Sequence, residues 1–126
     1  GYVAVFVQHP GSDEAVWRGT PVVGRMSALK EAASAQNAQA RWLDIPAVLD
    51  QLTKWTAEPQ HPLHGTCDMT KVGMSGHSFG ANTTQGVSGQ SFPVIGQRLT
   101  DSRIDAAIPF SPGMPALGDG TRQFQD

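Results

Sequence analysis

The stretch Lys71-Val-Gly-Met-Ser-Gly-His-Ser-Phe-Gly-Ala81 decides how the rest of the chain is interpreted. Within it, residues 76–80 fit the pattern Gly-x-Ser-x-Gly, which between a strand and a helix forms a sharp turn carrying a nucleophilic serine. Val72 to Met74 is a short apolar run suited to a buried strand, and residues 79–84 can begin a helix. The sequence therefore predicts a strand, a tight turn at Ser78 and a helix.

Two glycines flank this turn. We expect Gly76 and Gly80 to lie where the strand and the helix approach closely, so that a Cβ at either position would clash. We also expect a strained backbone at Ser78, because the chain must reverse within about one residue.

The length, composition and net charge of the chain limit the class of protein to which it can belong. A length of 126 residues suits one domain, and 9 basic against 11 acidic residues give a net charge of -2. No basic stripe is present, so nucleic acid is not expected as a partner. No uninterrupted apolar run is long enough to span a bilayer. The start of the chain lacks the features of a signal peptide, and the sequence indicates no localisation.

The first predicted element is a strand. Tyr2 to Val7 is an uncharged run of β-branched, aromatic and small residues, typical of a strand covered on both faces. It ends at residues 9–13, a cluster of turn formers that we expect to border the ligand crevice. His9 could be a catalytic base, but we favour a loop histidine that hydrogen-bonds its own turn.

The second predicted element is helical. Residues 27–39 favour a helix but have a thin apolar face. Pro46 allows two interpretations of the next stretch: Asp44 is an N-cap with the proline in the first turn, or a longer helix is kinked there. The apolar stripe, which we expect to pack in the core, consists of Trp42, Ile45, Val48, Leu49, Leu52 and Trp55.

Residues 58–68 form a polar loop that brings potential metal ligands together in the sequence. His61, His64, Cys67 and Asp68 lack the paired Cys-x-x-Cys units and the helical His pairs of known metal sites. We therefore expect solvated loop side chains, with neither a metal nor a cofactor. Cys67 is the single cysteine of the chain and excludes an internal disulfide.

The remaining elements complete an alternating order. We predict a helix from Phe79 to Gly89, a loop over 90–102, a strand from Ile104 to Phe110 and no regular element from there to Asp126. Strands that alternate with helices predict an α/β fold, with a parallel sheet and helices on both faces. Three strands would bury little apolar area, so the segment would be marginal as an independent unit.

The predicted turn supplies part of a catalytic site. A serine hydroxyl needs a base, usually histidine, and a third group that orients the base. The backbone N–H of Phe79, the residue after the serine, would be one donor to an oxyanion, and a loop after an earlier strand would supply the second.

The order of residues along the chain leaves this site without a base. In this architecture the acid and then the histidine follow the serine. All four histidines precede Ser78 or adjoin it, and the side chain of His77 is carried to the other side of the turn. Four acids follow Ser78, but none of them has a histidine after it in the sequence to orient: Asp101, Asp105, Asp119 and Asp126.

Four segments together resemble the α/β-hydrolase superfamily, and the resemblance touches most of the chain. The most similar branch is that of the dienelactone-hydrolase-like proteins and the platelet-activating-factor acetylhydrolase-like esterases. The segments that carry the resemblance are Gly1 to Asp13, Arg41-x-x-Asp44 with Leu49 to Leu52, Val72 to Ala81, and Ile104 to Pro112.

The resemblance implies that residues 1–126 are a single partial domain containing strands 4 to 6 of the family. The oxyanion loop would then precede Gly1, and the catalytic histidine would follow Asp126; the loop at residues 9–12 is not the oxyanion loop. Ser111 stands where the acetylhydrolase-like branch has its acid, so the acid is expected after strand 7. Dienelactone hydrolases use cysteine, and Ser78 therefore favours an esterase-like relative.

These observations predict a serine hydrolase acting on a small-molecule ester or acyl substrate, with Ser78 as nucleophile and Phe79 as oxyanion donor. We expect the 126-residue segment alone to be inactive. Two alternatives remain: a non-catalytic binding protein that keeps the fold, and an acyltransferase that uses the same nucleophile. The sequence indicates neither the substrate nor the oligomeric state.

Overall fold

The computed structural model describes residues 1–9, 18, 21, 24 and 35–112. Its elements follow the order α2 (Ala35–Ala57), β1 (Val72–His77), α3 (Phe79–Val87) and β2 (Ile104–Phe110). The predictions for residues 10–13, for 113–126 and for the part of the 27–39 helix before Ala35 lie outside the described residues, whereas residues 35–39 are helical in α2.

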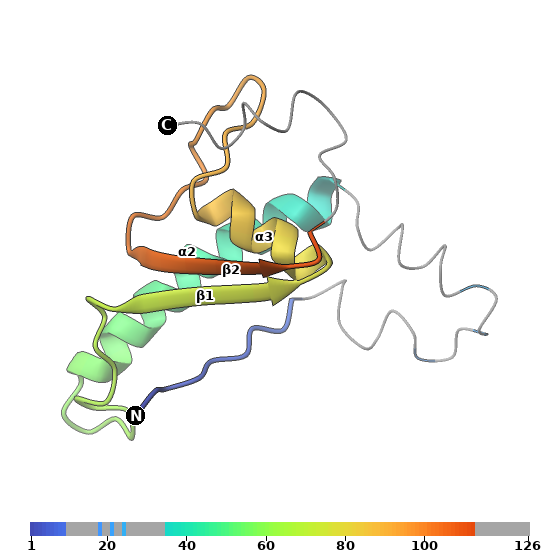
Figure 1. Cartoon of the computed structure of the whole chain (residues 1–126). Helices are drawn as coiled ribbons and strands as arrows, with labels where there is room; N and C mark the ends of the chain where they lie inside the picture. The colour runs from blue at the N-terminus through green and yellow to red at the C-terminus, as the bar shows by residue number, and fades with distance from the viewer. Residues whose placement is uncertain (10–17, 19–20, 22–23, 25–34, 113–126) are drawn as a thin grey trace.

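The two strands form a parallel sheet joined by a crossover through α3. Met74 pairs with Ala107 and Gly76 with Pro109, and the register shifts between Val72 and Gly73. Helix α3 packs against both strands, and α2 packs against α3, as Figure 1 shows. An α/β arrangement with parallel strands is therefore confirmed for this part of the chain.

The core lies between α2, α3 and one face of the sheet. Ile45, Leu49 and Val87 form its buried centre, and the residues packed around them are Trp42, Met69, Val72, Met74 and Ile104. On the opposite face Ile108 and Phe110 remain more than half exposed. Helices were predicted on both faces of the sheet. The two described helices, α2 and α3, both lie on the core face.

The predicted strand at Tyr2 to Val7 is wrong in the described structure. Residues 1–9 have no regular secondary structure, and Phe6 is 94% exposed. They run beside the sheet toward the end of β1 (Figure 1), and together with β1 and α2 they line a groove of about 890 Å³. A strand needs a neighbour for its backbone groups, and the described strands pair only with each other.

Helix α2 resolves the two interpretations of Pro46 in favour of the longer helix. It begins at Ala35 and contains Pro46, whose missing N–H removes one internal hydrogen bond. Ile45, Leu49 and Leu52 are buried as expected from the stripe. Trp55, by contrast, stacks on the ring of His61 at 4.9 Å between centroids.

Helix α3 and strand β2 agree closely with their predictions. Helix α3 begins at Phe79, as expected, and ends at Val87, two residues earlier than predicted. Gly89 then takes a φ of 116°, a conformation that favours glycine. Strand β2 has the predicted bounds, and β1 extends past Met74 to His77, so that the sheet ends directly at the turn.

Candidate active site

Ser78 alone joins β1 to α3, in a backbone conformation that residues with a side chain rarely adopt. Its φ is 55° and its ψ is -115°. A non-glycine residue in such a region carries strain of about 1–3 kcal/mol, which persists only where the surroundings hold it. The predicted strand, sharp turn, helix and strained backbone are therefore confirmed, and Ser78 is exposed at the end of the sheet.

Hydrogen bonds on both sides of the residue hold this conformation. The N–H of Ser78 donates to the carbonyl of Phe110 at 3.0 Å, which continues the pairing of the two strands. Its carbonyl accepts from the N–H groups of Ala81 at 3.0 Å and Asn82 at 3.2 Å in the first turn of α3. Both peptide groups of the serine are thus fixed, and its side chain projects from a rigid corner.

The two flanking glycines have different roles. A Cβ on Gly76 would overlap the carbonyl group of Gly80 and would lie 2.9 Å from Oγ1 of Thr84. The expectation of a close approach is confirmed there. The expected clash of a Cβ is wrong for Gly80, where the added atom would meet only Nη2 of Arg41, at an ordinary 3.9 Å. Only Gly76 must lack a Cβ, because the backbone of α3 occupies the space where that atom would stand.

The backbone N–H of Phe79 is placed where it could donate a hydrogen bond to an oxyanion formed at Ser78. Phe79 is the first residue of α3, and the first N–H groups of a helix have no acceptor within it. Among the described residues no backbone acceptor outside the helix takes this N–H. The group therefore remains available beside Ser78, at the end of the helix that carries partial positive charge.

Two residues that were assigned no role at the turn from the sequence support it, Arg41 and Thr83. The guanidinium of Arg41 lies 4.5 Å from the ring centroid of Phe79, and its Nε donates to Oγ1 of Thr83 at 3.1 Å. The pKa of Arg41 is lowered by burial, and the negative charge of Asp44 opposes this. Arg41 and Thr83 are 42 residues apart, so no local pattern reveals the contact.

His9 contacts helix α2, and the turn that it was predicted to bond, residues 10–13, lies outside the described residues. The residue is 7% exposed, and its Nδ1 lies 2.7 Å from Oδ2 of Asp44 in α2. This pair has the composition of a base and its orienting acid. Within the described residues, however, no hydrogen bond links it to the hydroxyl of Ser78, and it is not assigned that role.

The other histidines have local surroundings. Nδ1 of His61 accepts the N–H of Leu63 at 3.2 Å. His64 and His77 are exposed. His77 is the last residue of β1, and its side chain lies on the exposed face of that strand, away from the helices. Over residues 35–112 no hydrogen bond joins a histidine to Ser78.

The acids after the serine also lie in structural contacts. Asp101 binds Arg103, and Oδ2 of Asp105 accepts the N–H of Val72 at 2.8 Å. Ser111, which stands where the acetylhydrolase-like branch has its acid, has a φ of 50°. Asp119 and Asp126 lie outside the described residues.

The described residues contain no cluster of three His, Cys, Asp or Glu side chains that could hold a metal ion. Cys67 is a half-buried thiol whose N–H donates to Oγ1 of Thr56 at 3.2 Å. No helix in the described ranges has the length and hydropathy to cross a membrane.

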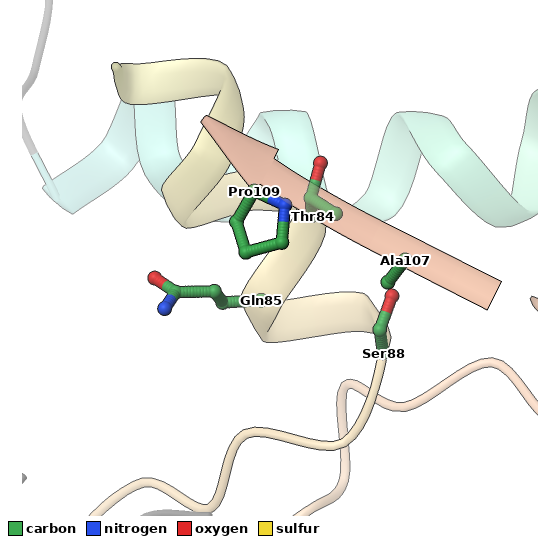
Figure 2. A pocket seen from close by; sticks show the side chains of 5 residues that line it. All are labelled: Thr84, Gln85, Ser88, Ala107 and Pro109. Atoms are coloured by element: carbon green, nitrogen blue, oxygen red, sulfur yellow. The ribbon is translucent and has the colours of Figure 1, made fainter. Parts of the chain in front are cut away.

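A second hollow, of about 330 Å³, lies on the helix side of β2. Figure 2 shows its lining side chains, Thr84, Gln85, Ser88, Ala107 and Pro109. Oγ of Ser88 is buried and makes no hydrogen bond to the described residues. Ser78 does not line this hollow, so it is not part of the candidate site.

Comparisons with protein-family models, with curated proteins and with solved structures found no match to this chain.

Proposed function

We propose that Ser78 is the nucleophile of a serine hydrolase of the α/β-hydrolase type that acts on carboxylic esters of small molecules. One observation carries this proposal: a serine with a φ of 55° is the sole link between a parallel strand and a helix. A strained residue at such a place is typical of functional sites, and the Gly-x-Ser-x-Gly pattern assigns it the nucleophilic role.

The reaction follows from the groups around the serine. Oγ of Ser78 attacks the ester carbonyl, its proton passes to a base, and the carbonyl oxygen becomes an oxyanion. The N–H of Phe79 then donates to that oxygen, where its charge develops. The base returns the proton to the leaving alcohol, and water hydrolyses the acyl-serine.

The base and the acid belong, in this proposal, to sequence outside residues 1–126. The supporting observation is that the described histidines lie elsewhere: His9 contacts Asp44, His61 stacks on Trp55, and His77 is exposed. The segment is then one partial α/β-hydrolase domain. Residues 1–126 alone would turn over no nitrophenyl ester.

The test uses the full-length polypeptide that contains this segment and a fluorophosphonate probe, which labels activated serines. The wild-type protein should be labelled, and Ser78→Ala should lose both labelling and nitrophenyl ester hydrolysis. Ser75→Ala is the matched control, because Ser75 is an exposed serine of β1 three residues away. Labelling that survives in Ser78→Ala would refute the proposal.

A non-catalytic binding protein of the same fold is the second candidate. The observation that favours it is that no described histidine is hydrogen-bonded to Ser78. The two candidates differ in one result. A hydrolase is labelled by the probe in its wild-type, full-length form, whereas a binding protein is labelled neither in that form nor as Ser78→Ala.

A further inference from the structure

The guanidinium of Arg41 lies against the first turn of α3, directly after the proposed nucleophile. It contacts the aromatic ring of Phe79 and hydrogen-bonds Thr83, and its Nη2 lies 3.9 Å from the place that a Cβ on Gly80 would occupy. All three residues belong to the turn whose first N–H is the proposed oxyanion donor. One side chain of α2 thus reaches across the helix interface to the site.

Thr83 transmits this contact to the backbone of Phe79. Its hydroxyl accepts from Nε of Arg41 at 3.1 Å and donates to the carbonyl of Phe79, also at 3.1 Å. A hydroxyl carries one proton and two lone pairs, so both bonds form at once. The bond from the arginine occupies a lone pair and leaves the proton directed at the carbonyl. Thr83 is 2% exposed, so water does not compete.

Phe79 is therefore held at two points, one directly by Arg41 and the other through the Thr83 hydroxyl to which Arg41 donates. The ring is held by the cation over its face, an interaction of about 0.5–2 kcal/mol depending on desolvation. The carbonyl is held through Thr83. The N–H of Phe79 belongs to the same planar peptide group as the carbonyl of Ser78, which accepts from Ala81 and Asn82. Holding the ring and the carbonyl of Phe79 restrains rotation about its N–Cα bond, and therefore the angle at which this peptide group meets the first turn of the helix.

From this geometry we infer that Arg41 is a positioning residue: through Thr83 and the Phe79 ring it aims the Phe79 N–H at the oxyanion. The inference rests on the proposed function. A positioning role for Arg41 predicts a loss of kcat, whereas a purely structural role predicts a loss of stability. An oxyanion donor acts on the transition state, so its misalignment lowers kcat and leaves KM unchanged.

The decisive variants are Arg41→Met and Thr83→Val in the full-length polypeptide. We expect each to lower kcat for nitrophenyl acetate and the rate of fluorophosphonate labelling by about 10- to 100-fold, with KM unchanged. Inhibition by phenylboronic acid, which forms a tetrahedral adduct with serine, should weaken by a similar factor. Thr83→Ser keeps the hydroxyl and should restore most of the rate.

Two matched controls separate positioning from stability. Arg103 also contacts α2, through Asp50 and the carbonyl of Pro46, but does not touch the turn at Ser78. Thr53 makes the same type of bond, to the carbonyl of Leu49, as Thr83 makes to Phe79. Arg103→Met and Thr53→Val should lower Tm and leave kcat at the wild-type value.

The outcomes are distinct. A folded Arg41→Met with wild-type kcat and labelling, in a protein where Ser78→Ala abolishes both, overturns the inference alone. Equal losses of kcat in Arg41→Met and Arg103→Met overturn it too, since they indicate general destabilisation. If Arg41→Met does not fold, Thr83→Val and Thr83→Ser decide by the same criteria. Labelling that survives in Ser78→Ala refutes the proposed function itself.

Discussion

Gly76 in β1 and Gly80 in α3 lie in direct contact, because the carbonyl group of Gly80 fills the space where a Cβ on Gly76 would stand. This contact sets how closely the helix approaches the strand behind Ser78. It also makes the two glycines unequal, although they are symmetric about the serine in the sequence.

Gly76→Ala should therefore destabilise the protein by about 1–3 kcal/mol, the usual cost of inserting a methyl group where none fits. The overlapping atoms belong to the backbone of Gly80, which cannot turn aside as a side chain can. Gly80→Ala is the matched control: the added methyl has space, and alanine favours the helix by up to about 1 kcal/mol. Urea unfolding measures both changes, and equal losses for the two variants would contradict this account.

A second glycine contact joins the two helices. A Cβ on Gly86 would overlap the indole ring of Trp42 in α2. We expect Gly86→Ala to destabilise the protein by about 1–3 kcal/mol. Its cost should shrink in a Trp42→Leu background, because the smaller side chain leaves room for the methyl. A double-mutant cycle should give a coupling of about 1 kcal/mol or more, and strict additivity would show that the two residues do not compete for space.

The sequence predicted those parts of the fold that depend on neighbours along the chain. The strand Val72–His77, the turn at Ser78 and the helix from Phe79 follow one another directly, and Gly76 permits their contact. The prediction for Tyr2 to Val7 was wrong because its residue types suit a strand only where another strand is available for pairing. The described strands β1 and β2 pair with each other.

The site was predictable to the same extent. The pattern indicated Ser78 and the N–H of Phe79, both within one turn. The contacts of Arg41 with Thr83 and of His9 with Asp44 join residues 42 and 35 positions apart. Such pairs depend on how α2 packs, and the spacing of apolar residues shows which face of a helix is buried but not which polar groups meet beyond it.

The strain at Ser78 gives a third prediction. Glycine adopts a positive φ without a steric penalty, whereas alanine keeps the Cβ that causes the strain. Ser78→Gly should therefore be more stable than Ser78→Ala by about 1 kcal/mol, after allowing for the greater entropy of glycine in the unfolded chain. Both variants lack the hydroxyl, so the difference reports the backbone alone. Thermal unfolding of the two proteins side by side measures it, and a less stable Ser78→Gly would contradict the strain at this residue.

The last prediction concerns pH and the carboxylate of Asp101. Arg103 donates to it from Nε at 2.9 Å and from Nη2 at 2.6 Å, and these hydrogen bonds lower the pKa of Asp101 below its ordinary value. A folded-state pKa below the unfolded one means that the charged form favours folding. This contribution is complete above the unfolded pKa of about 4, and it is lost as the pH falls through the folded value.

Asp101→Asn removes the charge, so the stability difference between it and the wild-type protein should be constant from about pH 7 to pH 5 and should diminish below about pH 4. Urea midpoints measured at each pH give this difference directly. Asp68→Asn is the control, because the hydrogen bonds from Thr70 lower the pKa of Asp68 at an exposed site, where solvent weakens the effect. The constant difference should therefore be smaller for Asp68→Asn. A difference for Asp101→Asn that stays unchanged down to pH 2.5 would show that its carboxylate has the same pKa in the folded and unfolded states.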